Sequence, residues 1–288
     1  MGGLGRFLMR IMDAQTGWAR PFGNFNQRWL AALFRPIRPI KDLLNGRWLG
    51  HPLHAVLTDV PIGILFMVIV FDVVGQPTAA DWALVVGVLT MAAAAVAGLA
   101  DYTDTDGTAR TRATLHGTIM VVTLAIYLVS IGLRTAGPAD RTAAVIVSIV
   151  GFLALSAGAF VGGDVVYVLG NMVSRHAFRG PGTQWVSLDL PDGTELEEGV
   201  PTKAKAGLNT LALAKVGDTI HALHDVCAHA GGSLSRGKFV DGCLECPLHA
   251  SRYQVTDGHA TRGPTVYDQP AYEVRRTQGG AWEARRRA

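Results

Sequence analysis

The chain has 288 residues, of which 49% are hydrophobic, and its mean hydropathy is +0.25. This length allows two domains, and this composition is too apolar for a purely soluble protein. The formal net charge is only +3, and the first 48 residues carry most of the excess, so the charge does not indicate a nucleic-acid partner.

Residues 1–48 form a basic leader. Apolar residues alternate there with arginine and lysine between Trp29 and Ile40, which predicts an amphipathic cytoplasmic segment at the membrane surface. Pro36 and Pro39 argue against one straight helix, and a partly disordered leader is the alternative. No apolar stretch with a small-residue cleavage site follows, so the leader does not resemble a signal peptide.

Four apolar stretches follow, each long enough to cross a bilayer, which takes about 17 to 25 mainly apolar residues. They are Ala55–Val74, Trp82–Ala100, Gly117–Leu133 and Thr142–Gly163. We therefore predict an α-helical transmembrane four-helix bundle over residues 49–176. Two small-residue steps would allow close helix packing in lipid. They are Ala94/Gly98 and Gly158/Gly162.

Arginine and lysine in the short loops set the expected orientation. Twelve of them would lie on one side, namely Arg6, Arg10, Arg20, Arg28, Arg35, Arg38, Lys41, Arg47, Arg110, Arg112, Arg175 and Arg179. Only Arg134 and Arg141 would lie on the other. Because positive loops stay in the cytoplasm, we expect a multi-pass protein of the bacterial inner membrane with both termini cytoplasmic.

Polar residues gather near the cytoplasmic ends of these spans. They are His51, His54, Asp59, Asp101, His116, Asp164 and His176. Such residues are costly in a membrane and usually face a bundle interior or a cavity. Three interpretations stay open: a structural polar layer, a haem b held by His54 and His116 from diagonal helices, or a quinone pocket. Pro52 indicates that the first helix begins between His51 and His54.

The run GHPLHAVLTDVPIG, residues 50–63, carries a resemblance. It resembles the opening of a bacterial four-helix membrane family of unknown function that is recognised by a His-Pro-Leu-His start. The resemblance covers about residues 48–176, and it implies no activity.

Beyond a linker at residues 177–184 the pattern changes to strand and turn, which predicts an all-β domain over residues 185–288. The expected strands are Trp185–Leu190, Leu211–Lys215, Thr219–His224, Lys238–Leu244, Tyr253–Thr256 and Tyr272–Arg276. The terminal Arg285–Arg287 are expected to be a solvated end.

Two short motifs in this domain pair a cysteine with a histidine. Cys227-x-His229 is followed, after sixteen residues, by Cys246-x-x-His249. Two thiolates and two imidazoles suit either tetrahedral zinc or a two-iron cluster. Because each motif supplies one ligand of each kind, two loops can hold an elongated cluster with both cysteines on one iron and both histidines on the other.

The surrounding residues resemble a Rieske [2Fe–2S] domain from residue 185 to residue 286. The matching features are CAHAGGSL, Gly237, CPLH, Ser251, Gly258 and the Gly263-Pro264 step. By this resemblance Cys227 and Cys246 would hold a buried iron, and His229 and His249 the outer iron near solvent. The extra cysteines of the cytochrome bc type are replaced here by Gly232 and Leu248.

Ser251 and Tyr253 occupy positions that resemble those of high-potential Rieske centres. There the two hydroxyls donate hydrogen bonds to a bridging sulfide and to a cysteine sulfur. Such bonds stabilise the reduced cluster, so we expect a potential in the middle or upper part of the range of about −150 to +300 mV.

The remaining cysteine and histidines carry less information. Cys243 is expected to be a buried free thiol, with a redox thiol as the alternative. Structural or surface roles are expected for His221, His224 and His259. No phosphate loop in a βαβ context, no G-x-S-x-G elbow and no helical HExxH is present.

The sequence therefore predicts a membrane-anchored electron-transfer protein or oxidoreductase subunit. It would pass single electrons between a membrane donor, quinol or haem, and a cytoplasmic partner protein. Two alternatives stay open. One is a ferredoxin-like donor to a separate oxygenase with the helices as a mere anchor, and the other is a cluster-based redox sensor.

Overall fold

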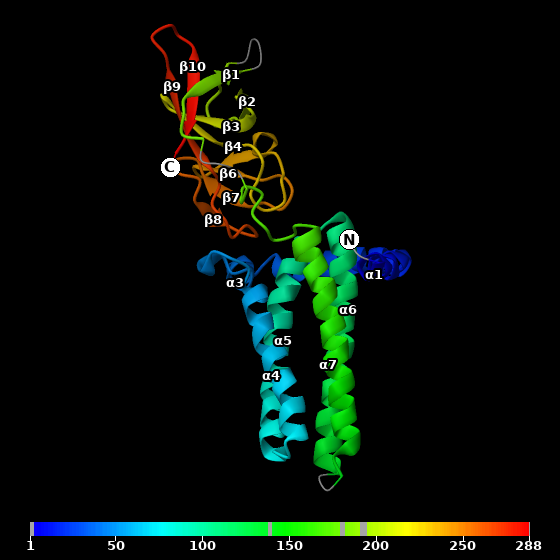
Figure 1. Ribbon diagram of the computed structural model, residues 1–288. Helices are drawn as coiled ribbons and strands as arrows, with labels where there is room; N and C mark the ends of the chain where they lie inside the picture. The colour runs from blue at the N-terminus through cyan, green and yellow to red at the C-terminus, as the bar shows by residue number, and fades with distance from the viewer. Residues whose placement is uncertain (1–2, 138–139, 179–181, 191–194, 288) are drawn as a thin grey trace. The chain divides into compact units, whose positions relative to one another are not determined.

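The computed structural model describes residues 3–137, 140–178, 182–190 and 195–287. Within these ranges the chain divides into two compact units, and Figure 1 labels most of their helices and strands. The first unit, Met1–Leu44 with Pro52–Asn171, is helical. The second, Asn45–His51 with Met172–Ala288, is mainly β.

The basic leader is helical rather than disordered in its described part. Its elements are α1 (Gly3–Ala14), α2 (Thr16–Phe34), α3 (Arg38–Leu44) and the 3-10 turn η1 (Arg47–Leu49). The expected break falls at Pro36, between α2 and α3, because proline cannot donate a helical hydrogen bond. Leu30 and Phe34 pack on Ala100 of the next helices, while Trp29 points outward and is exposed. The leader therefore keeps a free apolar face, as an interfacial segment requires.

Four long helices follow the leader in the first unit. They are α4 (Leu53–Val73), α5 (Pro77–Tyr102), α6 (Gly107–Ala136) and α7 (Thr142–Gly163), and α7 continues into the π-helical turn η2 (Asp164–Val168). Each is long and apolar enough to cross a membrane, with a mean hydropathy of 1.9 to 2.4 over its most apolar window. Four long apolar helices are confirmed at the predicted positions, although α5 and α6 extend further into polar sequence at both ends.

The outer surface of this bundle is apolar. Each helix exposes large side chains, for example Phe66, Leu89, Val121 and Leu153, of which Val121 is 69% exposed. Water-soluble monomers rarely expose apolar surface continuously over such lengths. Lipid tails would cover it, and the backbone hydrogen bonds are satisfied inside each helix, as the bilayer requires.

A buried charge network joins the two helical hairpins, α4–α5 and α6–α7, near the turns that connect their helices. Arg134 of α6 donates to Asp72 of α4, with Nη1 3.0 Å from Oδ1, and to Asp81 of α5 at 3.1 Å. Arg141, just before α7, also binds Asp81. The predicted orientation counted Arg134 and Arg141 as loop residues. In the structure Arg134 is buried and ion-paired with Asp72. Removing one member would leave a buried charge uncompensated.

The second unit contains a closed barrel with strand order β1-β10-β9-β4-β3-β2 and a four-stranded sheet with order β5-β6-β7-β8. The strands are β1 (Val186–Asp189), β2 (Thr202–Ala206), β3 (Asn209–Val216), β4 (Thr219–His224), β5 (Lys238–Val240), β6 (Cys243–Glu245), β7 (Arg252–Gln254), β8 (Ala260–Arg262), β9 (Ala271–Arg276) and β10 (Trp282–Arg286). A 3-10 turn, η3 (Leu234–Arg236), precedes β5. The all-β prediction is confirmed.

Several strand predictions were wrong in detail. The expected strand Lys238–Leu244 is two strands, because Asp241 and Gly242 have positive φ, 51° and 75°, and form the tight turn of a β-hairpin. The terminal arginines are not simply a solvated end, because Arg285 and Arg286 pair with β9. Three strands, β2, β8 and β10, were not expected at all.

Candidate metal centre

Two loops with the same backbone geometry carry the cysteine–histidine pairs. The first follows β4 and the second joins β6 to β7. In each loop the cysteine N–H donates to the carbonyl five residues on, from Cys227 to Gly232 and from Cys246 to Ser251, at 2.8 Å. The residue four places after each cysteine has positive φ, and in the second loop this residue is an alanine. A positive φ is unfavourable for residues other than glycine. The hydrogen bonds within the loop must therefore stabilise this conformation at Ala250.

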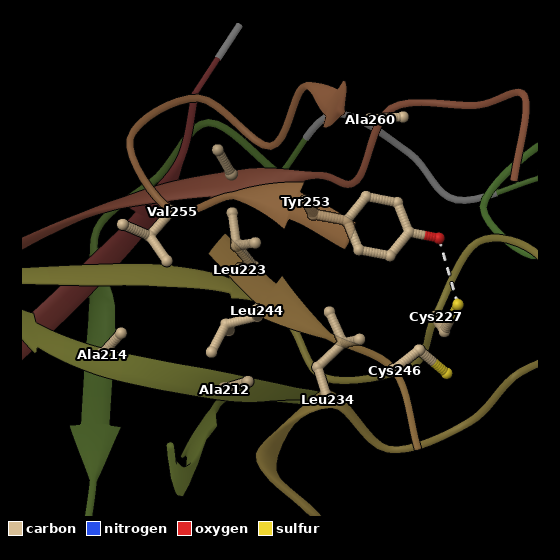
Figure 2. Packing of buried hydrophobic residues seen from close by; sticks show 11 residues of the cluster. Ala212, Ala214, Leu223, Cys227, Leu234, Leu244, Cys246, Tyr253, Val255 and Ala260 are labelled. Atoms are coloured by element: carbon tan, nitrogen blue, oxygen red, sulfur yellow. Dashed lines mark hydrogen bonds between the residues drawn. The ribbon is translucent and has the colours of Figure 1, made fainter. Parts of the chain in front are cut away.

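The two sulfurs lie together in the core. Cys227 and Cys246 are 1% and 3% exposed, and they belong to one apolar cluster, shown in Figure 2. The neighbouring Cys227 thiol, assisted by the N–H groups of Leu248 and His249 and opposed by burial, lowers the pKa of Cys246. The neighbouring Cys246, followed by burial, raises the pKa of Cys227. The pair therefore favours a thiolate at Cys246, and thiolate is the form that binds metal.

The two histidines lie at the edge of the same loops. The ring centroids of His229 and His249 are 5.0 Å apart, with the planes at 89°. Both side chains are only partly buried, and the neighbouring Leu248 is exposed. The loops therefore place the cysteine sulfurs inside and the imidazoles at the surface.

Two hydroxyls approach the sulfurs or their loop. The hydroxyl of Tyr253 on β7 lies 3.0 Å from Cys227 Sγ, as the dashed line in Figure 2 marks. Burial is the main cause that raises the pKa of Tyr253, and the neighbouring Cys227 adds to it. The phenol therefore stays protonated and can donate a hydrogen bond. Ser251 is buried, and its Oγ accepts the N–H of Thr265 at 3.1 Å. The hydroxyl proton of Ser251 therefore stays available to donate a hydrogen bond to another acceptor.

Residues that the sequence analysis did not single out hold the first loop. Gln269 Oε1 accepts the N–H of Ala228 at 2.9 Å, and its Nε2 donates to the carbonyl of Val226 at 2.7 Å. Asp225 accepts the N–H of Ser235 at 2.8 Å. Burial opposes ionisation of Asp225, but hydrogen bonds from the two serines beside it lower its pKa overall. No motif marks these residues, because Gln269 binds backbone groups and Asp225 binds a backbone N–H together with the hydroxyl of Ser233.

His176 was grouped with the membrane residues, but the structure places it in the second unit against this loop. Its Nε2 lies 2.7 Å from the carbonyl oxygen of Val226. The preceding Arg175 donates its N–H to the carbonyl of Ala228 at 3.1 Å. Arg175 and His176 of the second unit thus hold the backbone of the first cysteine loop.

Comparison with known proteins identifies both halves. Residues 185–273 match the family described as Rieske [2Fe-2S] domain. The ferredoxin subunit of anthranilate 1,2-dioxygenase from Burkholderia cepacia is 33% identical over 96 residues, which cover 33% of this chain and 87% of that subunit. The chain belongs to the Rieske [2Fe–2S] family. Residues 50–175 match a second family, described as Predicted membrane protein (DUF2231).

Further relatives of the Rieske domain are also ferredoxins. The ferredoxin component of a naphthalene 1,2-dioxygenase system from Pseudomonas aeruginosa is 34% identical over 88 residues, 30% of this chain and 78% of that protein. Among solved structures, the ferredoxin of carbazole 1,9a-dioxygenase from Nocardioides aromaticivorans IC177 is 29% identical. The match covers 36% of this chain and all of that one, with a TM-score of 0.32.

The donor set fits the [2Fe–2S] cluster of a Rieske protein better than a single zinc ion. Within the described residues, no three His, Cys, Asp or Glu side chains converge on one metal position, whereas tetrahedral zinc needs four ligands around one point. A cysteine pair inside and a histidine pair outside suit an elongated two-iron centre. Gly232 adds to the fit, because a Cβ there would lie 2.7 Å from Cys246 Sγ.

Of the membrane residues, the structure brings His54 and His116 together, with ring centroids 6.2 Å apart. The other candidates are dispersed. His51 belongs to the second unit, and α4 begins after it, at Leu53, as Pro52 indicated. Asp59 is exposed on α4. Asp101 is buried on α5, and Asp164 is ion-paired with Arg112, with Nε 3.2 Å from Oδ2.

The remaining cysteine and histidines occupy structural or surface positions. Cys243 is buried, with its Sγ 3.5 Å from Thr261 Oγ1. His224 is buried and accepts the N–H of Val226 at 3.1 Å. His221 is partly buried on β4, and His259 lies in a turn beside Asp268.

Proposed function

We propose that this Rieske protein passes single electrons between a donor in the membrane, quinol or haem, and a cytoplasmic partner protein. Cys227 and Cys246 would hold the inner iron, and His229 and His249 the outer iron. The cluster would supply one-electron chemistry, since a Rieske centre cycles between two redox states. The observation that carries the proposal is the separation of a buried sulfur pair from a surface histidine pair.

The residues around this centre would have two roles, tuning the potential of the cluster and contacting the partner protein. Tyr253 and Ser251 would donate hydrogen bonds to sulfur and so set the potential. The partly buried histidines, with exposed Leu248 beside them, would form the contact through which electrons enter and leave. Because the relatives are ferredoxin subunits and components of dioxygenase systems, an oxygenase-type protein is the class of partner that we expect there.

Those relatives also favour a second function. The domain would then be a ferredoxin-like donor to a separate oxygenase, and the helices would serve only as an anchor. The two functions differ in whether a redox centre lies among the helices, because a mere anchor needs none.

The ligand assignment is tested by changing one histidine. His249→Cys should abolish the characteristic rhombic paramagnetic signal of the reduced cluster, because replacing an imidazole by a thiolate adds negative charge and changes the pair of histidine ligands on which that signal depends. Electron paramagnetic resonance of the reduced full-length protein measures this. His259→Cys, at an exposed turn of the same unit, is the matched control and should keep the wild-type signal. An unchanged spectrum in His249→Cys would refute the assignment.

We also propose that both termini, and with them the Rieske domain, are cytoplasmic, since arginine and lysine are concentrated in the loops on that side. A green fluorescent protein fused to the C-terminus should be fluorescent, and alkaline phosphatase fused there should be inactive. Fusions after Gly137, between α6 and α7, should behave in the opposite way. Active phosphatase at the C-terminus would reverse the proposed orientation.

A further inference from the structure

His54 and His116 lie across the bundle from one another. α4 and α6, which carry them, each pack against α5 and α7, so the two histidine helices are the diagonal pair. The ring centroids are 6.2 Å apart, and the planes are inclined at 72°. Two imidazoles from different hairpins therefore meet in the apolar part of the chain.

Each hairpin holds its histidine in the same way. His54 Nδ1 lies 2.8 Å from the carbonyl oxygen of Ala94 on α5, and His116 Nδ1 lies 2.8 Å from that of Gly158 on α7. Four residues further on, a glycine lies against each ring. A Cβ at Gly98 would be 2.9 Å from His54 Cε1, and one at Gly162 would be 3.1 Å from His116 Cε1. The arrangement is thus repeated in both hairpins.

These hydrogen bonds decide which nitrogen is protonated. A backbone carbonyl can only accept, so Nδ1 carries the proton in both rings, and a neutral ring then has its lone pair on Nε2. Metal-binding histidines are typically held in this way, with the second nitrogen donating to a carbonyl or a carboxylate. Both side chains are therefore prepared to bind a metal through Nε2.

We propose that His54 and His116 are the two axial ligands of a haem b in the helical unit. With a metal–nitrogen bond of about 2 Å, as for imidazole on zinc, two rings on opposite sides of one metal have centroids roughly 6 Å apart. No third His, Cys, Asp or Glu side chain joins this pair at one metal position within the described residues. A bare ion would lack ligands, whereas a porphyrin brings its own four.

The neighbouring helices suit the porphyrin. A haem between ligands on diagonal helices lies across the line that joins them, so its edges approach the other two helices, here α5 and α7. Between Ala92 and Gly98 every residue of α5 except Val96 is alanine or glycine, and residues 156–159 of α7 read Ser-Ala-Gly-Ala. Side-chain bulk is smallest where the edges of the macrocycle would need space.

The competing interpretations account for less of this geometry. A quinone carbonyl needs a hydrogen-bond donor, and the Nδ1 protons of both rings are already donated to backbone carbonyls. A structural polar layer would explain those two bonds, but it does not require two imidazoles from diagonal helices to lie with their ring centroids 6.2 Å apart. The inference rests on the proposed function, because the haem would be its membrane donor.

The test uses the full-length protein, purified from membranes of cells supplied with a haem precursor. Haem is measured as the pyridine haemochrome, and the cluster by acid-labile sulfide and paramagnetic resonance on the same sample. We expect about three irons per chain, two from the cluster and one from the haem, and a sharp low-spin α-band after reduction. His54→Ala and His116→Ala should each lose this band and keep the cluster signal. His51→Ala, outside α4, is the control and should keep both.

A ligand that still binds iron separates coordination from folding. His116→Met should retain haem and raise the haem potential, because a thioether ligand favours the ferrous state. A purely structural histidine would produce no such shift. Wild-type protein with a full cluster and no haem would overturn the inference and leave the proposed function standing, and so would an unchanged α-band in both alanine variants. Haem without any cluster would instead overturn the proposed function.

Discussion

Gly232→Ala is expected to destroy most of the cluster occupancy while leaving the barrel folded. The added Cβ would lie 2.7 Å from Cys246 Sγ and 3.0 Å from Leu248 Cγ, so the sulfur or the loop has to move. Overpacking of this kind costs about 1–3 kcal/mol, and about 1.4 kcal/mol corresponds to a tenfold change. Cluster retention should therefore weaken roughly ten- to a hundredfold, which acid-labile sulfide per chain and the absorption of the cluster will measure.

Gly279→Ala is the matched control. It makes the same chemical change in the turn between β9 and β10, where the added Cβ would meet only Thr277 Oγ1 at 3.8 Å. It should keep the full cluster. Circular dichroism of both variants should match the wild type, because the barrel core lies in a separate apolar cluster. Full sulfide content in Gly232→Ala would show that the loop yields without cost, and the tight fit at Cys246 would then have no role.

The β unit shows where prediction from sequence ends. Ligand spacing pointed to the cluster because cysteine and histidine are rare and their chemistry is specific. β2 was missed because Thr-Lys-Ala-Lys-Ala has little of the bulky apolar character that usually marks a strand, and only the barrel explains its buried alanines. Gln269 and His176 could not be predicted at all. They act on the backbone of the first cysteine loop, and such contacts depend on tertiary structure.

The helical unit was easier to predict in outline and harder in its polar detail. Hydropathy alone located the spans, because a bilayer sets a minimum length for apolar helices. It could not show that Arg134 is buried against Asp72. The same limit applied to His54 and His116. The sequence placed them on diagonal helices, but only the structure shows that each ring is held by a carbonyl of its own hairpin.

Tyr253→Phe is expected to lower the reduction potential of the cluster and to keep its ligands unchanged. The phenol lies 3.0 Å from Cys227 Sγ, and because burial raises its pKa it donates throughout the ordinary pH range. The bond is stronger to the reduced, more negative cluster, so its loss should favour the oxidised form. A hydrogen bond to a charged group is worth about 1.5–3 kcal/mol.

If about 1–2 kcal/mol of that bond distinguishes the two redox states, the potential should fall by roughly 40–85 mV, since about 59 mV is tenfold for one electron. A redox titration followed by paramagnetic resonance or circular dichroism measures this directly. Tyr267→Phe is the control: its hydroxyl donates to the carbonyl of Met172 at 2.9 Å, so it should leave the potential close to that of the wild type. Equal potentials in the wild type and Tyr253→Phe would mean that the sulfur of Cys227 does not accept this bond in the loaded protein, and tuning would then have to come from Ser251 and the loop amides.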